Sequence, residues 1–143
     1  MGLFEKFKGI SEFNDKEAFM GMVYGVCACD GSIDDDELEM LSRAVCRLKL
    51  YKDCSTKDVL SIIETVNRAN DKNGLDWLFL EAKRVLSLEQ KKSAFTLAVD
   101  LAFADGSAGE AEEAFIEGIY KVLEIPDDYV AKALEVMEVR HNS

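Results

Sequence analysis

The chain has 143 residues, of which 48% are hydrophobic, and its 28 acidic and 17 basic side chains give a formal net charge of −11. This length and apolar content allow one domain over residues 1–143 with a substantial core. The excess of acid excludes a nucleic-acid-binding protein, which needs a basic face, and favours cations or basic protein surfaces as partners. No apolar run approaches the roughly 20 residues that span a bilayer, so we do not expect membrane association. The four cysteines, without a secretion signal, indicate reduced thiols and a cytoplasmic location.

The first ten residues, MGLFEKFKGI, carry their own apolar pattern. Leu3, Phe4, Phe7 and Ile10 fall on one side of a short amphipathic helix. We expect this helix to pack against the domain, with weak membrane association as the alternative.

Helical spacing of apolar residues dominates the rest of the chain, which has a single proline and almost no alternating β-branched stretch. We therefore predict an all-α fold of about seven helices. They are expected over about 15–29, 34–49, 55–74, 75–86, 87–104, 109–124 and from 127 onwards. The helix over 87–104 is apolar nearly all round, as expected of a central element.

Helix starts are marked by capping residues. Ser55 with Asp58 and Ser87 with Gln90 fit capping boxes, in which the two side chains bond each other's backbone N–H groups. Asp127 is predicted to cap the last helix.

A shift of 75 residues aligns the two halves of the chain, about 15–50 and 90–125, without a gap. The phrase DGSIDDDE, beginning at Asp30, then falls on DGSAGEAE, beginning at Asp105. This predicts a duplicated helix-loop-helix, with the helix over 75–86 joining the halves. Two such pairs can form a four-helix core with pseudo-twofold symmetry.

Capping explains much of these two acidic loops. Acids in the first turn of a helix are stabilised by the helix dipole, and glycine suits the turn after the preceding helix. Ser32 with Asp35 fits a capping box, and Ser107 with Glu110 fits one at the matched place in the second copy. Asp34 with Glu37 is an overlapping alternative in the first copy.

Metal binding is the other interpretation of the same loops. Carboxylates and a hydroxyl at the exit of one helix and the start of the next make an oxygen-rich pocket suited to Ca²⁺, Mg²⁺ or Mn²⁺. The loop is not an EF-hand, because Leu41 stands at position 12 when Asp30 is counted as the first ligand. The first loop is the better site, because Gly109 stands where the first copy has Asp34. The candidate ligands are Asp30, Ser32, Asp34, Glu37, Asp105, Ser107 and Glu112.

The two acidic phrases, each following an apolar helix in the runs ACDG and FADG, resemble the TerB-like family of bacterial tellurite-resistance proteins. The resemblance extends from about Asn14 to Met137. It implies about seven helices around a four-helix core and a role in bacterial resistance to tellurite and other stresses. It also implies divalent-metal binding through Asp30, Glu37, Asp105 and Glu112. The second loop has fewer acidic residues than the first, so the sequence departs from a pattern with one metal site in each loop.

Other chemistry has little support in the sequence. Cys27 and Cys29 align with two alanines in the second copy, so we expect them to pack as small hydrophobes. The only histidine, His141, is expected in a frayed tail, which leaves zinc without a ligand set. Asp100, inside an apolar helix, is expected to make a satisfied polar contact. There is no histidine base in the body of the chain, no phosphate loop and no serine elbow, so we do not expect an enzyme.

These observations lead to two hypotheses for function. The first is a non-enzymatic, cytoplasmic, stress-associated protein that binds a divalent cation through the acidic loops. The alternative is a metal-free acidic module that binds basic proteins in a stress-response complex.

Overall fold

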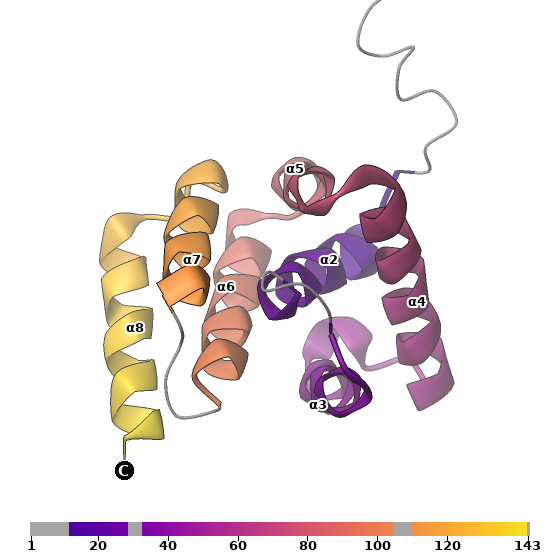
Figure 1. Cartoon of the computed structure of the whole chain (residues 1–143), viewed down its shortest axis with the longest axis horizontal. Coiled ribbons are helices and arrows are strands. Elements are labelled where there is room, and N and C mark those ends of the chain that lie inside the picture. The colour runs from indigo at the N-terminus through magenta and orange to yellow at the C-terminus, as the bar shows by residue number, and fades with distance from the viewer. Residues whose placement is uncertain (1–11, 29–32, 105–109, 143) are drawn as a thin grey trace, which may run out of the picture.

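The computed structural model describes residues 12–28, 33–104 and 110–142, and over these ranges the chain forms seven α-helices, one 3₁₀ helix and no strand (Figure 1). The predicted all-α fold class is therefore confirmed. The predicted N-terminal helix lies outside the described residues. None of the described helices combines the length and the apolar character needed to cross a membrane. The elements are α2 (Asp15–Cys27), α3 (Asp35–Cys46), η1 (Lys49–Tyr51), α4 (Thr56–Asn73), α5 (Leu75–Val85), α6 (Leu88–Phe103), α7 (Glu110–Val122) and α8 (Asp127–His141).

Local capping fixes several of these boundaries. Both predicted boxes are present, Ser55 with Asp58 at the start of α4 and Ser87 with Gln90 at the start of α6. The predicted cap at Asp127 is wrong. Pro126 occupies the N-cap position of α8, and Asp127 is already the first helical residue. Proline has no N–H to satisfy, so it is well tolerated where a helix begins.

The central helix is α2, which packs against α4, α5 and α6. Every residue from Ala18 to Val26 is buried, so α2 has no solvent-facing side over this stretch. The expectation that the helix over 87–104 would be enclosed is only partly correct. Six residues of α6 are buried, but Ser93 is exposed and Leu97 is half-buried. The difference arises because α5 covers α2, while one face of α6 stays open.

The 75-residue repeat is reproduced in three dimensions. Helix α3 begins at residue 35 and α7 at residue 110, a separation of 110 − 35 = 75. The two leading helices of the repeat, α2 and α6, pack against each other at the centre. Helices α3 and α4 lie on the α2 side of this pair, and α7 and α8 on the α6 side (Figure 1). Helix α5 lacks a described counterpart in the first half.

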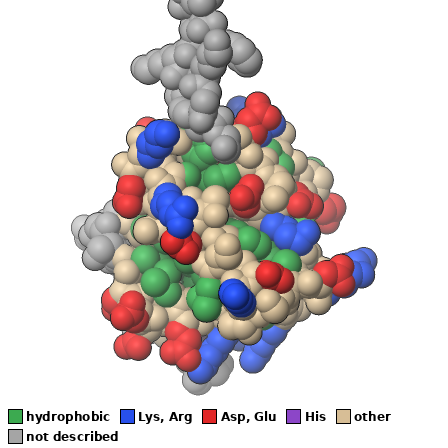
Figure 2. All heavy atoms as spheres, turned by 90° about the vertical axis from the view of Figure 1, so that its right-hand side faces the viewer, with side chains coloured by type: hydrophobic (Ala, Val, Ile, Leu, Met, Phe, Trp, Pro, Cys, Tyr) green, Lys and Arg blue, Asp and Glu red, His purple; other side chains and the backbone are tan. Residues whose placement is uncertain are grey.

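The surface charge is mixed on the face that Figure 2 presents, the right-hand side of Figure 1, where α4 lies. Acidic and basic side chains alternate there, with hydrophobic side chains between them. Among the described residues, three ion pairs are helical i, i+4 pairs: Arg43 with Glu39 on α3, Arg68 with Glu64 on α4, and Lys121 with Glu117 on α7. Exposed pairs of this kind contribute about 0.3–0.5 kcal/mol each. The net negative charge is therefore not gathered into one patch on this face.

Candidate functional site

The described half of the first acidic loop forms a capping box at the start of α3. The Asp34 carboxylate accepts the Glu37 backbone N–H through Oδ1 at 2.8 Å. In return, Glu37 Oε1 accepts the Asp34 N–H at 3.4 Å. The predicted Ser32–Asp35 box is wrong, because Asp35 is the first residue inside the helix and Asp34 is its cap. Both boxes fit the sequence, and the structure selects the one that starts α3 two residues later.

Most of the remaining candidate ligands fall beyond the described parts of the chain. Asp30, Ser32, Asp105 and Ser107 lie outside the described residues, and Glu112 belongs to α7 with its side chain also outside them. Over the ranges that are described, no group of three or more His, Cys, Asp or Glu side chains comes together to hold a metal ion. The metal site therefore stays a prediction.

The chemistry of the described donors fits a hard cation. Asp34 is exposed and offers carboxylate oxygens, the ligand type that Ca²⁺, Mg²⁺ and Mn²⁺ prefer. Its capping bond uses only one oxygen, Oδ1. Glu37 is half-buried and held in place by the same box, so its orientation is fixed before any ligand arrives. Asp35 and Asp36 add two exposed carboxylates in the first turn of α3.

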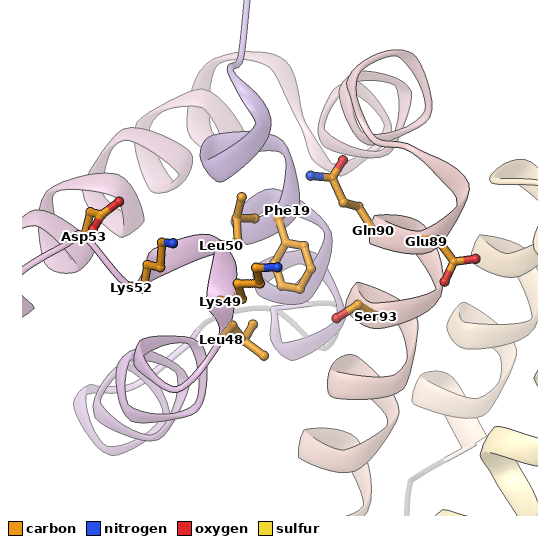
Figure 3. A pocket seen from close by; sticks show the side chains of 9 residues that line it. All are labelled: Phe19, Leu48, Lys49, Leu50, Lys52, Asp53, Glu89, Gln90 and Ser93. Carbon is orange, nitrogen blue, oxygen red and sulfur yellow. The ribbon is translucent and has the colours of Figure 1, made fainter.

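A second feature of the surface is a groove along the open face of α6, called the α6 groove below. At its upper end, a hollow of about 470 Å³ separates α6 from η1 and its flanking residues. Figure 3 shows Phe19 of α2 and Lys49 of η1 on one side of this hollow, with Gln90 and Ser93 of α6 on the other. The hollow continues into another of about 500 Å³, whose far wall is Tyr129 and Met137 of α8. The two share Leu48, Glu89 and Ser93.

The lower end of the α6 groove carries a polar cluster. Asp100 Oδ1 lies 2.7 Å from His141 Nε2 and accepts a hydrogen bond from Arg140 Nε at 3.1 Å. The His141 ring stacks on Phe103, with centroids 6.3 Å apart, and its side chain is only 18% exposed. The expectation of a frayed tail was wrong, because these contacts hold the end of α8 on α6. Asp100 makes the satisfied polar contact that was expected of it.

Among the described residues, the shifted pKa values of Tyr51, Tyr24 and Asp58 arise from contacts that stabilise the fold. Burial raises the pKa of the Tyr51 phenol, whose hydroxyl donates to the Lys16 carbonyl at 2.6 Å. Burial also raises the pKa of Tyr24, with the nearby Asp71 carboxylate adding to the effect. The pKa of Asp58 is lowered by its capping bonds with Ser55. None of these groups lines the α6 groove.

The cysteines are dispersed. Cys27 is half-buried and packs against the hydrophobic core, as predicted, while Cys29 lies outside the described residues. Cys46 is exposed on α3, and Cys54 is half-buried between η1 and α4. These positions give no soft-metal site among the described residues.

The family model described as "Tellurite resistance protein TerB" matches residues 16–135. Comparison with curated proteins and with solved structures gives no match.

Proposed function

Because this chain belongs to the TerB family of tellurite-resistance proteins, we propose that it is a non-enzymatic, cytoplasmic protein of bacterial stress resistance that binds a divalent cation through its acidic loops. The supporting observation is the register of the repeat. Helices α3 and α7 begin 75 residues apart, so Glu37 and Glu112 stand at the same helical position, with Asp30 and Asp105 seven residues before them.

Capping alone does not account for this repeated pair. The box at α3 uses Asp34 and Glu37, but the second copy has Gly109 at the position of Asp34. Glu112 is nevertheless kept, as is Asp105. A shared ligand role for Asp30 with Glu37, and for Asp105 with Glu112, explains the pair in both copies. When bound, a divalent cation would join the exit of one helix to the start of the next, and its charge would offset the carboxylates that gather there.

Cation-dependent stability tests this proposal. The melting temperature is measured in chelator and then with Ca²⁺, Mg²⁺ or Mn²⁺ added separately. A cation at 100 times its dissociation constant stabilises the folded state by about 2.7 kcal/mol. At roughly 3 °C per kcal/mol for a chain of this size, the expected shift is roughly 8 °C.

The informative variants are Glu37→Gln and Asp30→Asn, because they remove charge with little change in shape. Gln supports a capping box as well as Glu does, and the chain already uses one at Gln90. Glu37→Gln should therefore keep the stability measured in chelator and lose most of the cation shift. Glu135→Gln, at an exposed position of α8, is the matched control for net charge. If no cation moves the melting temperature of the wild type, the metal proposal is refuted.

A metal-free interaction module is the second candidate, and the capping box at α3 favours it. Asp34 and Glu37 already bond each other's backbone, so the first loop has a structural use without metal. In that case the exposed acids Asp35, Asp36 and Glu39 would meet a basic protein surface. Added divalent cations would then leave the melting temperature unchanged, and binding to a basic partner would weaken steeply as the salt concentration rises.

A further inference from the structure

The upper hollow of the α6 groove is lined mainly by apolar side chains. The ring of Phe19, a residue that is only 2% exposed, lies beside it, and the half-buried Leu48 and Leu50 line it on the η1 side (Figure 3). Its volume of about 470 Å³ is in the range of small-molecule sites, which are mostly apolar and carry a few polar groups that orient the ligand. The hollow therefore has the size and the lining of a site for a small, partly apolar molecule.

Hydrogen-bond donors surround this hollow. Lys49 and Lys52 line it from η1 and the residue that follows, and neither forms an ion pair with a described residue. On the α6 side, Gln90 uses its Oε1 to accept the Ser87 N–H, which leaves its amide nitrogen to donate to a ligand. Figure 3 shows this nitrogen on the side of the hollow where η1 lies. Ammonium and amide N–H groups only donate, so the cluster suits an anion.

Two acids line the same end of the groove, but they do not cancel its positive charge. Glu89 Oε1 lies 3.7 Å from Lys92 Nζ, so a lysine of the same helix offsets the charge of Glu89. Figure 3 shows the Glu89 carboxylate turned away from Lys49. The three lysines at this end, Lys49, Lys52 and Lys92, outnumber Asp53 and Glu89 by one. This end therefore carries one net positive charge, in a chain whose net charge is −11.

The lower hollow continues the apolar surface along α6. It shares Leu48 with the upper hollow and adds Leu97, which is half-buried, and Met137 of α8, which is buried. The polar groups of Thr96 and Asp100 are already bonded to residues of α8. A molecule in the lower hollow would therefore meet mainly the apolar side chains.

We infer that the α6 groove binds an amphipathic carboxylate with the chemistry of a medium-chain fatty acid. Its head lies at Lys49 and Lys52, and its tail follows Leu97 towards Met137. The single net positive charge matches a carboxylate better than a phosphate monoester, whose charge is nearly two. The groove follows α6 from residue 89 to residue 100, which at about 1.5 Å per residue is roughly 16 Å, a length that suits an extended chain. No described residue of the acidic loops lines the groove, so cation binding at the loops is not required.

An NMR titration of the full chain with defined amphiphiles tests this inference. Octanoate, decanoate and decylammonium are added separately, below their micelle concentrations and in chelator, and the backbone amide shifts are followed. Decanoate should shift the amides of residues 48–52 and 89–100. It should bind about 15-fold more tightly than octanoate, because each buried CH₂ contributes about fourfold. Decylammonium has the same tail and the opposite charge, and it should bind more weakly than decanoate.

Three variants separate the head from the tail. Lys49→Gln should lower the affinity for decanoate about fivefold, as expected for an exposed ion pair. Lys72→Gln makes the same charge change at an exposed position of α4 that does not line the groove, and it should leave the affinity unchanged. Ser93→Trp fills the groove from an exposed position of α6 and should abolish binding while the far-UV circular dichroism shows a folded helical chain.

Four results would overturn the inference. The first is that decanoate shifts no amide, and the second is that decylammonium binds as tightly as decanoate. The third is an equal loss of affinity in Lys49→Gln and Lys72→Gln. The fourth is that the shifted amides lie around Leu80 of α5 and Val122 of α7, which line a separate apolar hollow of about 370 Å³.

Discussion

Glu81 anchors the beginning of the described chain to α5, and its removal should destabilise the fold measurably. Its carboxylate accepts the Phe13 backbone N–H at 2.9 Å through Oε1. The same group pairs with Arg84, whose Nε lies 2.9 Å from Oε2. Glu81 is 8% exposed, so these partners replace the water that it has lost. Phe13 is itself buried, with its ring edge-on to Trp77.

The two contacts can be separated by substitution. Glu81→Ala leaves the Phe13 N–H buried without a partner, at about 1–3 kcal/mol. It also removes the ion pair, which contributes at most about 1 kcal/mol because Arg84 is 47% exposed. Glu81→Gln keeps an acceptor for the N–H and loses the charge, so it should cost about 1 kcal/mol. At roughly 3 °C per kcal/mol, the alanine variant should melt about 6–12 °C lower and the glutamine variant about 3 °C lower.

The pH dependence of the glutamine variant checks the same reasoning. Burial raises the pKa of Glu81, but the hydrogen bonds from Arg84 and the Phe13 N–H outweigh it and hold the pKa below its ordinary value of 4.5. A group whose pKa is lower in the folded state than in the unfolded state stabilises the folded state at pH values above its unfolded pKa. That stabilisation is lost as the pH falls through the folded-state pKa. The gap between wild type and Glu81→Gln should therefore be full above pH 4.5 and close at lower pH.

A surface pair provides the control for Glu81. Glu64→Gln breaks an ion pair with Arg68 in which both side chains are more than 60% exposed, so it should cost no more than about 0.5 kcal/mol. Unfolding in urea at several pH values measures both variants. Equal losses for Glu81→Gln and Glu81→Ala, or a gap between wild type and Glu81→Gln that does not change with pH, would refute the anchoring role.

Two further predictions concern matched positions of the repeat. Gly25→Ala would place a Cβ atom 2.6 Å from Phe79 Cζ, and this overpacking should destabilise the fold by about 1–3 kcal/mol in urea unfolding; a more stable variant would show that the ring moves freely. Asp100→Asn should weaken the contacts of α6 with Arg140 and His141 of α8. The backbone amides in the last turn of α8 should then exchange faster with deuterium, while the exchange rates of the α4 amides should not change.

The sequence predicts the helices well, because their signals are local. Apolar spacing places all seven helices, and the boxes at Ser55 and Ser87 give the starts of α4 and α6 correctly. Where two caps overlap, local rules do not choose between them. Ser32 and Asp34 each have an acid three residues later. In the structure, α3 begins after Asp34 and packs against α4.

The long-range contacts could not be predicted from spacing. Asp100 and His141 are 41 residues apart, and nothing in the local sequence of either indicates the other. An acid inside an apolar helix did signal that a partner was needed. The anchor at Glu81 was missed for the same reason, since its partner Phe13 is 68 residues away and offers only a backbone N–H.

The differences between the two halves follow from what covers each central helix. Under α5, the first half has Gly25, and the close approach of Phe79 requires that this position carry no side chain; at Gly21 an added Cβ would lie 3.3 Å from the Phe13 ring. The second half has Thr96 and Asp100 at the matched places, and their polar groups bond to the Lys92 carbonyl and to α8. These bonds join this face of α6 to α8, whereas the matched glycine Gly25 of α2 faces Phe79 of α5.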